Sequence, residues 1–297
     1  MTENEFVLFD RLEVIKKTIQ EHGEDSWCIS FSGGKDSMVL HTLVDMALPN
    51  NKIPRVYANT GIELLEMVKF VKKLKEKDER IDIIMPSVNI KRVLDEYGYP
   101  FKSKQHSFYV RVYQRHGMNS KAVQFYLKET GGKFDCPSKL RYQFTEEFKE
   151  KLKINDSCCK YMKEKPFDEY KKKHNKPNQI LGLMASEGGR RASVNCMTRI
   201  GKKLSFHPLS KVTKEWEDWF IETYNVELCC LYKEPYNFDR TGCKGCPFSI
   251  HIQEQLETME KYFPNERKQC EIIWKPIYEE YRRIGYRLKD EEQLKLL

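Results

Sequence analysis

Residues 27–37, Trp-Cys-Ile-Ser-Phe-Ser-Gly-Gly-Lys-Asp-Ser, place a short apolar run directly before a turn with two glycines. The apolar run predicts a strand, and the helical spacing of residues 38–46 predicts a helix after the turn. Two glycines allow a tight turn and a close approach of the backbone to a phosphate, and the first N–H groups of the helix offer an anion site. Lys35 adds a positive charge, and Ser32 and Ser37 add hydroxyl donors. The spacing differs from that of a Walker A loop. We therefore predict a phosphate-binding turn at residues 32–37.

Strands and helices alternate around this turn. Alternation of this kind is typical of parallel βαβ units in a doubly wound sheet, where ligands bind at the carboxyl ends of the strands. We expect an α/β fold with a mostly parallel sheet and a C-terminal portion rich in helices and cysteines. The expected elements are helix 6–22, strand 27–31, helix 38–46, strand 53–58, helix 62–75, strand 81–85, helix 253–262 and helix 270–284.

The composition indicates a soluble folded protein. Hydrophobic residues make up 40% of the 297 residues and charged residues 32%, which is too apolar for a disordered chain and too charged for a membrane bundle. No apolar run approaches the roughly 20 residues of a spanning helix, and the acidic residues near the N-terminus do not form the basic region of a secretory signal. We expect a cytoplasmic protein without a membrane partner.

The net charge of +8 is concentrated in the middle of the chain. Residues 102–128 carry six Lys or Arg and no carboxylate, and residues 149–176 carry ten Lys against five acidic residues. Such a surface suits a polyanionic nucleotide or a nucleic acid. Aromatic residues are interleaved with the cations of residues 102–128 and could stack on bases. The alternative, which we favour, is a helical region whose aromatics face the core.

Ten cysteines in a cytosolic chain of this length favour metal or redox chemistry over a disulfide framework. Two pairs stand out, the adjacent Cys158 and Cys159 and the Cys-Lys-Gly-Cys turn formed by Cys243 and Cys246. A Cys-x-x-Cys turn lets two thiolates converge on one ion or cluster. By itself it suits zinc, redox exchange or an iron–sulfur centre.

The complete string Ser-Gly-Gly-Lys-Asp-Ser after a strand resembles the PP-loop ATP pyrophosphatases, and its fold resembles that of the adenine nucleotide alpha hydrolases. Further matches resemble the phosphoadenosine phosphosulfate (PAPS) reductase-like branch of this superfamily. They are an Asn-Thr-Gly turn at residues 59–61 followed by Glu66, and the segment 182–191 that ends in Arg190 and Arg191. The resemblance implies a nucleotide, either ATP or an adenylyl sulfonucleotide, with Lys35 and Asp36 as catalytic residues. The implied nucleotide-binding residues are Ser32, Gly33, Gly34, Lys35, Asp36, Ser37, Thr60, Gly61, Glu66, Arg190 and Arg191.

The cysteines are similar to those of the [4Fe–4S] adenosine phosphosulfate reductases, which have Cys-Cys, a long gap and then Cys-x-x-Cys. Here the gap is 83 residues. The resemblance implies a [4Fe–4S] cluster held by Cys158, Cys159, Cys243 and Cys246, with zinc as the alternative. Adjacent cysteines are awkward zinc ligands, whose usual spacing is two to four residues.

One departure from that family limits the expected reaction. Its members carry a nucleophilic cysteine near the C-terminus, whereas the last cysteine here is Cys270, on an amphipathic stretch where we expect a buried structural thiol. We expect an enzyme of sulfur metabolism that reduces a sulfonucleotide or transfers sulfur, with a thiol donor or a sulfur-carrier protein as partner. One alternative is an ATP pyrophosphatase that activates a nucleic acid for phosphorothioation or thiolation, which needs Mg²⁺. The other is a non-catalytic nucleotide-binding or cluster-sensing subunit.

The expected domain organisation follows the same motifs. Residues 1–136 form the N-terminal part of the nucleotide-binding α/β domain, and residues 137–249 complete it with the cluster cysteines. Residues 250–297 form a C-terminal helical portion.

Overall fold

The computed structural model describes residues 1–128, 135–187 and 193–289. The chain divides into two compact units. The sheet unit comprises residues 1–59, 63–86 and 165–242, and the helical unit comprises residues 60–62, 87–164 and 243 onward. Each unit is thus assembled from separated stretches of the chain.

The sheet unit holds a six-stranded sheet in the order β3-β2-β1-β4-β6-β5. All neighbouring strands pair in parallel except the edge strand β5, which is antiparallel to β6. This arrangement confirms the predicted doubly wound, mostly parallel α/β fold. The strands are β1 (Trp27–Phe31), β2 (Arg55–Ala58), β3 (Ile81–Ile84), β4 (Asn178–Ile180), β5 (Met197–Ile200) and β6 (Lys203–Phe206).

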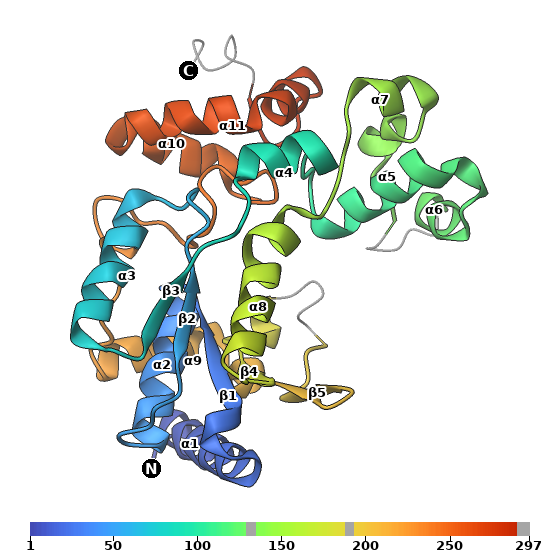
Figure 1. The fold of residues 1–297 in the computed structure, drawn as a ribbon. Helices are drawn as coiled ribbons and strands as arrows, with labels where there is room; N and C mark the ends of the chain where they lie inside the picture. The colour runs from blue at the N-terminus through green and yellow to red at the C-terminus, as the bar shows by residue number, and fades with distance from the viewer. Residues whose placement is uncertain (129–134, 188–192, 290–297) are drawn as a thin grey trace. The chain divides into compact units, whose positions relative to one another are not determined.

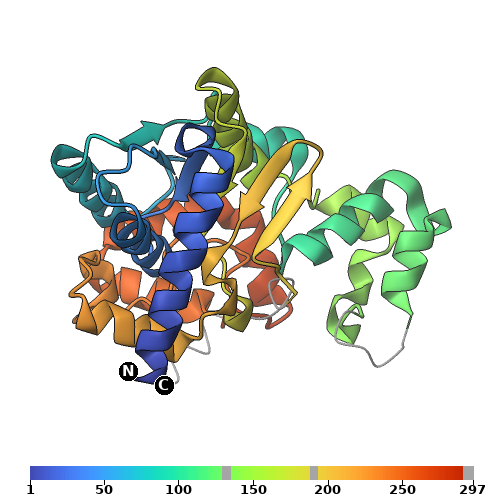
Figure 2. The same cartoon turned by 90° about the horizontal axis from the view of Figure 1, so that it is seen from below.

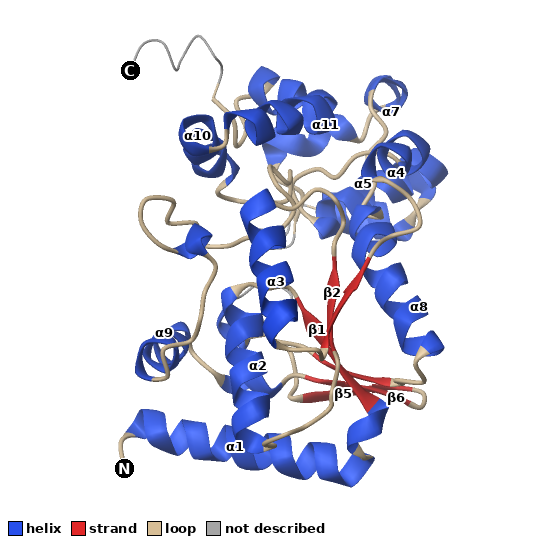
Figure 3. Cartoon of the chain, turned by 60° about the vertical axis from the view of Figure 1, so that its left-hand side comes forward, coloured by secondary structure: helices blue, strands red, loops and turns tan. Residues whose placement is uncertain are grey.

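Helices cover both faces of this sheet. Figure 3 shows α2 and α3 on one side of the strands and α8 on the other. Helix α1 packs against α2, and Figure 2 shows α1 in blue along its full length. The helices of the unit are α1 (Glu3–His22), α2 (Lys35–Ala47), α3 (Leu65–Lys77), α8 (Lys165–Lys173) and α9 (Lys214–Thr223).

Local sequence explains the central elements. Four of the five residues of β1 are buried, as an apolar central strand covered on both faces requires. Helix α1 begins with a capping box in which Thr2 and Glu5 satisfy each other's backbone N–H groups. Helix α3 begins at Leu65 rather than at the predicted residue 62, because the backbone of the preceding Leu64 is extended, with a ψ of 137°.

The helical unit consists of six α-helices among its described residues (Figure 1). The predicted C-terminal pair is confirmed, although α11 begins at Pro264, where proline suits the first helical turn, and not at residue 270. A π-helical turn, Lys160–Glu164, follows the adjacent cysteines. The helices are α4 (Ile90–Tyr97), α5 (Lys104–His116), α6 (Lys121–Leu127), α7 (Glu146–Lys151), α10 (Ile252–Tyr262) and α11 (Pro264–Arg283).

Within the described ranges, no helix combines the length and the apolar character that crossing a membrane requires.

Candidate nucleotide site and cysteine centre

The phosphate-binding turn, residues 32–37, links the end of β1 to the start of α2 in the sheet unit. Its two serines hold the turn from inside. The Ser37 hydroxyl lies 3.1 Å from the Ser32 hydroxyl and donates to the Gly34 carbonyl at 2.9 Å. Ser32 in turn accepts from the Gly34 N–H at 3.2 Å. The two hydroxyl groups that the sequence suggested as phosphate donors therefore also fix the shape of the turn.

The N-terminus of α2 lacks a side-chain cap at its N-cap residue, although the Tyr232 oxygen accepts a hydrogen bond from the Lys35 N–H. Gly34 occupies the N-cap position and supplies no side-chain acceptor to the first-turn N–H groups. Such groups, together with the helix dipole, attract phosphate or sulfate. The geometry is therefore suited to the predicted phosphate site.

Both glycines of the turn are closely packed, and Gly33 is sterically required. Gly33 has a φ of +72°, and a Cβ there would lie 2.7 Å from the Met67 Sδ and 2.8 Å from the Val71 Cγ2 on α3. A Cβ on Gly34 would lie 3.2 Å from the Tyr232 hydroxyl. Side chains from distant parts of the sequence thus close around the turn.

Tyr232 is a neighbour of the turn that the sequence analysis missed. The Lys35 ammonium lies over its ring, 5.3 Å from the centroid, and its hydroxyl hydrogen-bonds Thr241. Burial raises the pKa of Tyr232 to about 12, so the phenol remains neutral. Tyr232 can therefore position the Lys35 side chain without adding charge. An isolated tyrosine in a loop carries no sequence signal for this role.

Glu217 on α9 is a second missed neighbour. Its side chain is 3% exposed, and it hydrogen-bonds Asp36 in the first turn of α2. Burial raises the pKa of Glu217 to about 8, and the negative charges of Asp36 and Asp218 act in the same direction. An acidic residue between the buried Trp216 and Phe220 was the available signal, because that face of the helix is otherwise apolar.

The other predicted nucleotide residues are distributed over both units. Glu66 is on α3 in the sheet unit and pairs with Lys69 at 2.8 Å. Thr60 and Gly61 lie in the helical unit, where the Ile62 carbonyl accepts from the Lys244 N–H at 2.7 Å. Arg190 and Arg191 lie outside the described residues.

The four predicted cluster cysteines lie together in the helical unit. Cys158 interacts electrostatically with Cys159, Cys243 and Cys246, although the two pairs are 83 residues apart in sequence. Cys158 is buried, and Cys159, Cys243 and Cys246 are partly buried. All four are free thiols. The fold therefore places four available sulfur donors in one region.

Charge near the adjacent pair favours one thiolate. A hydrogen bond from Cys158 lowers the pKa of Cys159, and the ammonium groups of Lys104 and Lys163 act in the same direction. The same hydrogen bond and burial raise the pKa of Cys158. The two lysines therefore place positive charge beside the thiolates that a metal centre requires.

The spacing of these sulfur atoms bears on which metal they suit. Four thiolates on one tetrahedral zinc are about 3.8 Å apart, since each Zn–S bond is about 2.3 Å. Across the residues that the structure describes, no three of these cysteine sulfurs lie within 4.8 Å of one another. A zinc site is thus not preformed here.

Helix α11 holds the Cys-x-x-Cys loop by its carbonyl groups. The Trp274 indole donates to the Lys244 carbonyl at 3.0 Å, and the Tyr281 hydroxyl donates to the Pro247 carbonyl at 2.8 Å. The Tyr278 hydroxyl donates to the carbonyl of Gly245. These three aromatics are spaced along one face of the helix, so the loop is fixed before any ligand binds.

Cys270 lies beneath this loop and is fully buried. A Cβ on Gly245, whose φ is +58°, would lie 2.8 Å from the Cys270 sulfur. Burial raises the pKa of Cys270 to about 12. Cys270 is therefore a structural thiol, as the sequence indicated.

The family profile of the phosphoadenosine phosphosulfate reductase domain matches residues 26–132 and 128–249. The chain belongs to this family. A relative from Methanocaldococcus jannaschii, an uncharacterized protein, is 22% identical over 276 residues, which are 91% of this chain and 53% of the relative. The chain spans about half the length of that curated relative.

Several solved structures are similar to this chain at low sequence identity. A PAPS reductase from Candida auris is 10% identical with a TM-score of 0.43 and covers 78% of this chain and 93% of its own. The U34-tRNA thiolase NcsA from Methanococcus maripaludis, solved with its [4Fe–4S] cluster, is 14% identical with a TM-score of 0.38. The match covers 90% of this chain and 77% of the thiolase. An NH₃-dependent NAD synthetase from Campylobacter jejuni is 14% identical with a TM-score of 0.41. The match covers 97% of this chain and 99% of the synthetase.

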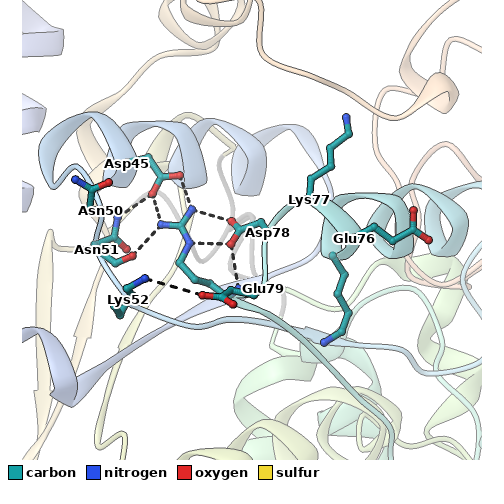
Figure 4. A pocket seen from close by; sticks show the side chains of 10 residues that line it. Asp45, Asn50, Asn51, Lys52, Glu76, Lys77, Asp78 and Glu79 are labelled. Atoms are coloured by element: carbon teal, nitrogen blue, oxygen red, sulfur yellow. Dashed lines mark hydrogen bonds and ion pairs between the residues drawn. The ribbon is translucent and has the colours of Figure 1, made fainter.

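This PAPS reductase-domain chain also carries an acidic group that is not suited to a metal. The ligand atoms of His41, Asp45 and Asp78 lie within 4.8 Å of one another. Two guanidinium groups already neutralise the Asp45 and Asp78 carboxylates. Arg55 contacts Asp45 at 2.6 Å, and Arg80 contacts Asp45 and Asp78, each at 2.7 Å. Figure 4 shows the Asp45 and Asp78 side chains pointing toward one another. The group is therefore an ion-pair network that joins α2 to the segment before β3.

The basic aromatic segment of the family member, residues 102–128, forms α5 and α6. Tyr113 and Tyr126 are buried, as expected for aromatics that face the core. Phe125 is 64% exposed. A nucleic-acid partner for this segment remains a prediction.

Proposed function

We propose that this chain is a PP-loop enzyme that binds an adenine nucleotide on residues 32–37 and carries a [4Fe–4S] cluster on Cys158, Cys159, Cys243 and Cys246. Membership of the PAPS reductase domain family supports an enzyme that acts on such a nucleotide. The observation that carries the proposal is the gathering of the two distant cysteine pairs in one unit.

The nucleotide part rests on Lys35 and on the N-terminus of α2, whose N-cap residue Gly34 provides no side-chain cap. The N–H groups of the first turn and the Lys35 ammonium can bind phosphate or sulfate oxygens, and Tyr232 steadies the lysine. We propose ATP as the nucleotide, with Mg²⁺ to neutralise its phosphates.

The metal part rests on the donor set. Four thiols, the nearby Lys104 and Lys163 and a loop held by α11 suit an anionic iron–sulfur centre. When bound, such a cluster supplies one-electron transfer. The lysines balance its charge, and α11 holds the loop that carries two of its ligands.

The reaction that fits best is activation by ATP followed by sulfur transfer. Cys270, the last cysteine of the chain, is buried beneath the Cys-x-x-Cys loop and cannot attack a sulfonucleotide. In the proposed step, an oxygen of the acceptor attacks the α-phosphorus of ATP and pyrophosphate leaves. Hydrosulfide released by an external sulfur carrier then attacks the activated atom of the acceptor, so that a bond to sulfur forms as the bond to oxygen breaks and AMP leaves. We propose a nucleic acid as the acceptor, because residues 102–128 carry six cations and no carboxylate.

The test compares two reactions of the anaerobically purified protein. Release of pyrophosphate from ATP that depends on added RNA or DNA supports sulfur transfer. Release of sulfite from adenosine phosphosulfate with a thiol donor supports reduction of a sulfonucleotide instead. Turnover of neither, despite nucleotide binding, would favour a non-catalytic sensing subunit.

A matched pair of lysine variants locates the site. Lys35→Ala should lower nucleotide affinity about 10- to 100-fold, the value of a charge-assisted hydrogen bond. Lys16→Ala removes the same charge from an exposed position on α1 and should leave affinity unchanged. Equal affinity in both variants would contradict a nucleotide site at residues 32–37.

A further inference from the structure

A buried acid lies against the phosphate-binding turn. Glu217 is 3% exposed, and its Oε1 atom has no hydrogen-bond partner among the residues that the structure describes. Its helix, α9, packs against α2, and its carboxyl group hydrogen-bonds the side chain of Asp36. Asp36 directly follows Lys35 in the turn, so this contact reaches the proposed nucleotide site.

The chemistry of this contact requires a proton. Two ionised carboxylates cannot hydrogen-bond each other, since neither carries a donor. A buried carboxylate with one oxygen lacking any donor would also be strongly unfavourable, whereas a neutral carboxyl group needs fewer partners. The geometry therefore places a proton between Glu217 and Asp36.

We propose that Glu217 is a positioning residue of the nucleotide site, whose protonated carboxyl group donates to Asp36 and sets the direction of the Asp36 carboxylate beside residues 32–37. This inference rests on the proposed function, because it concerns the same site. The inference goes beyond the proposed function because it assigns to the nucleotide site a further residue, Glu217 of α9, and a proton that Glu217 holds.

The surrounding charges explain why the proton is held. Burial, Asp36 and Asp218 all raise the pKa of Glu217, to about 8, and the positive charge of Lys35 opposes them. Tyr232, near the same turn, is neutral. Glu217 is therefore protonated at neutral pH and becomes ionised as the pH rises through about 8.

A bound nucleotide would strengthen this arrangement. Its phosphates add negative charge beside Asp36, which disfavours the ionised form of Glu217 further. Above pH 8, nucleotide binding should therefore take up a proton from solvent, and affinity should fall by up to about tenfold per pH unit. At neutral pH, where Glu217 already holds its proton, neither effect should appear.

The first measurement uses the unliganded full-length protein. Infrared difference spectra between about pH 6.5 and about pH 9.5 should show a protonated carboxyl band that is lost with a midpoint near pH 8. The band should be absent from Glu217→Gln and retained in Glu222→Gln, an exposed acid on the same helix. Absence of the band from the wild type, or its retention in Glu217→Gln, would overturn the inference.

The second measurement is calorimetric titration with ATP and Mg²⁺ in buffers of different ionisation enthalpy. Proton uptake above pH 8 should occur in the wild type and Glu222→Gln and vanish in Glu217→Gln. Glu217→Met, which keeps the volume of the side chain, serves as a second variant if the amide does not fold. ATP binding with the same proton uptake in every variant overturns this inference alone. Failure of ATP to bind to the wild type overturns the proposed function, and the infrared spectra then still decide whether Glu217 holds the proton.

Discussion

A Cβ atom on Gly33 would lie 2.7 Å from the Sδ atom of Met67. Gly33 is in the phosphate-binding turn and Met67 is on α3, so the helix after β2 closes the turn after β1. The positive φ of Gly33, +72°, adds a second reason for glycine at this position. The turn is thus shaped by tertiary packing as well as by its own serines.

Gly33→Ala should destabilise the sheet unit and abolish nucleotide binding. The backbone strain costs on the order of 1–3 kcal/mol, and the contact with α3 adds to it. Gly23→Ala is the matched control, because Gly23 has a similar φ of +77° but no atom within 4 Å of its added Cβ. Denaturant unfolding of both variants should show a larger loss for Gly33→Ala, and equal losses would contradict the packing argument.

Tyr278→Phe should loosen the Cys-x-x-Cys loop. The variant removes the hydrogen bond to the Gly245 carbonyl and leaves that buried group unsatisfied, at a cost of about 1–3 kcal/mol. Iron in the reconstituted protein should be lost to a chelator faster than from the wild type. Tyr224→Phe, at a partly exposed position in the sheet unit, should not change this rate. Equal rates of iron loss in both variants would show that the hydrogen bond from Tyr278 to the loop does not stabilise the metal centre.

The helical unit should lose stability in mild acid through His106. Its ring lies between Tyr126 and Gln143, at 2.9 Å and 2.7 Å, and burial lowers its pKa to about 3. Between about pH 6.5 and pH 3 the unfolded chain therefore binds a proton that the folded chain does not, so stability falls as the pH falls. From pH 6.5 to pH 5 the loss should be about 2 kcal/mol.

Urea unfolding at these two pH values, repeated on His106→Gln, isolates this effect. The glutamine variant cannot take up the proton and should lose less stability in acid than the wild type. The same acid loss in both proteins would assign it to other groups.

The sequence predicted the first half of the sheet because that half is local. The apolar residues of β1, β2 and β3 and the helical spacing between them define the first βαβ units without reference to the rest of the chain. The later strands are short, with three residues in β4, and their pairing beside β1 depends on contacts across about 150 residues. The hydrophobic periodicity also does not indicate that residues 87–164 belong to the helical unit, whereas α8, which follows them, belongs to the sheet unit.

The candidate site divides in the same way. Residues 32–37 and the four cysteines were found because each motif is compact in sequence. Glu217 and Tyr232 come from distant elements and reach the turn only through tertiary packing. Likewise, the support that α11 gives to residues 244–247 follows from the three-dimensional contact of the helix with the loop.

Iron and acid-labile sulfide analysis of the anaerobically purified protein, with its visible spectrum, tests the central claim most directly. The account predicts about four iron and four sulfide per chain. The double variant Cys158→Ala, Cys159→Ala should lose them, and Cys229→Ala, Cys230→Ala, which changes the adjacent cysteine pair of the sheet unit, should retain them. One zinc per chain without sulfide, or equal iron in both double variants, would contradict a cluster on Cys158, Cys159, Cys243 and Cys246.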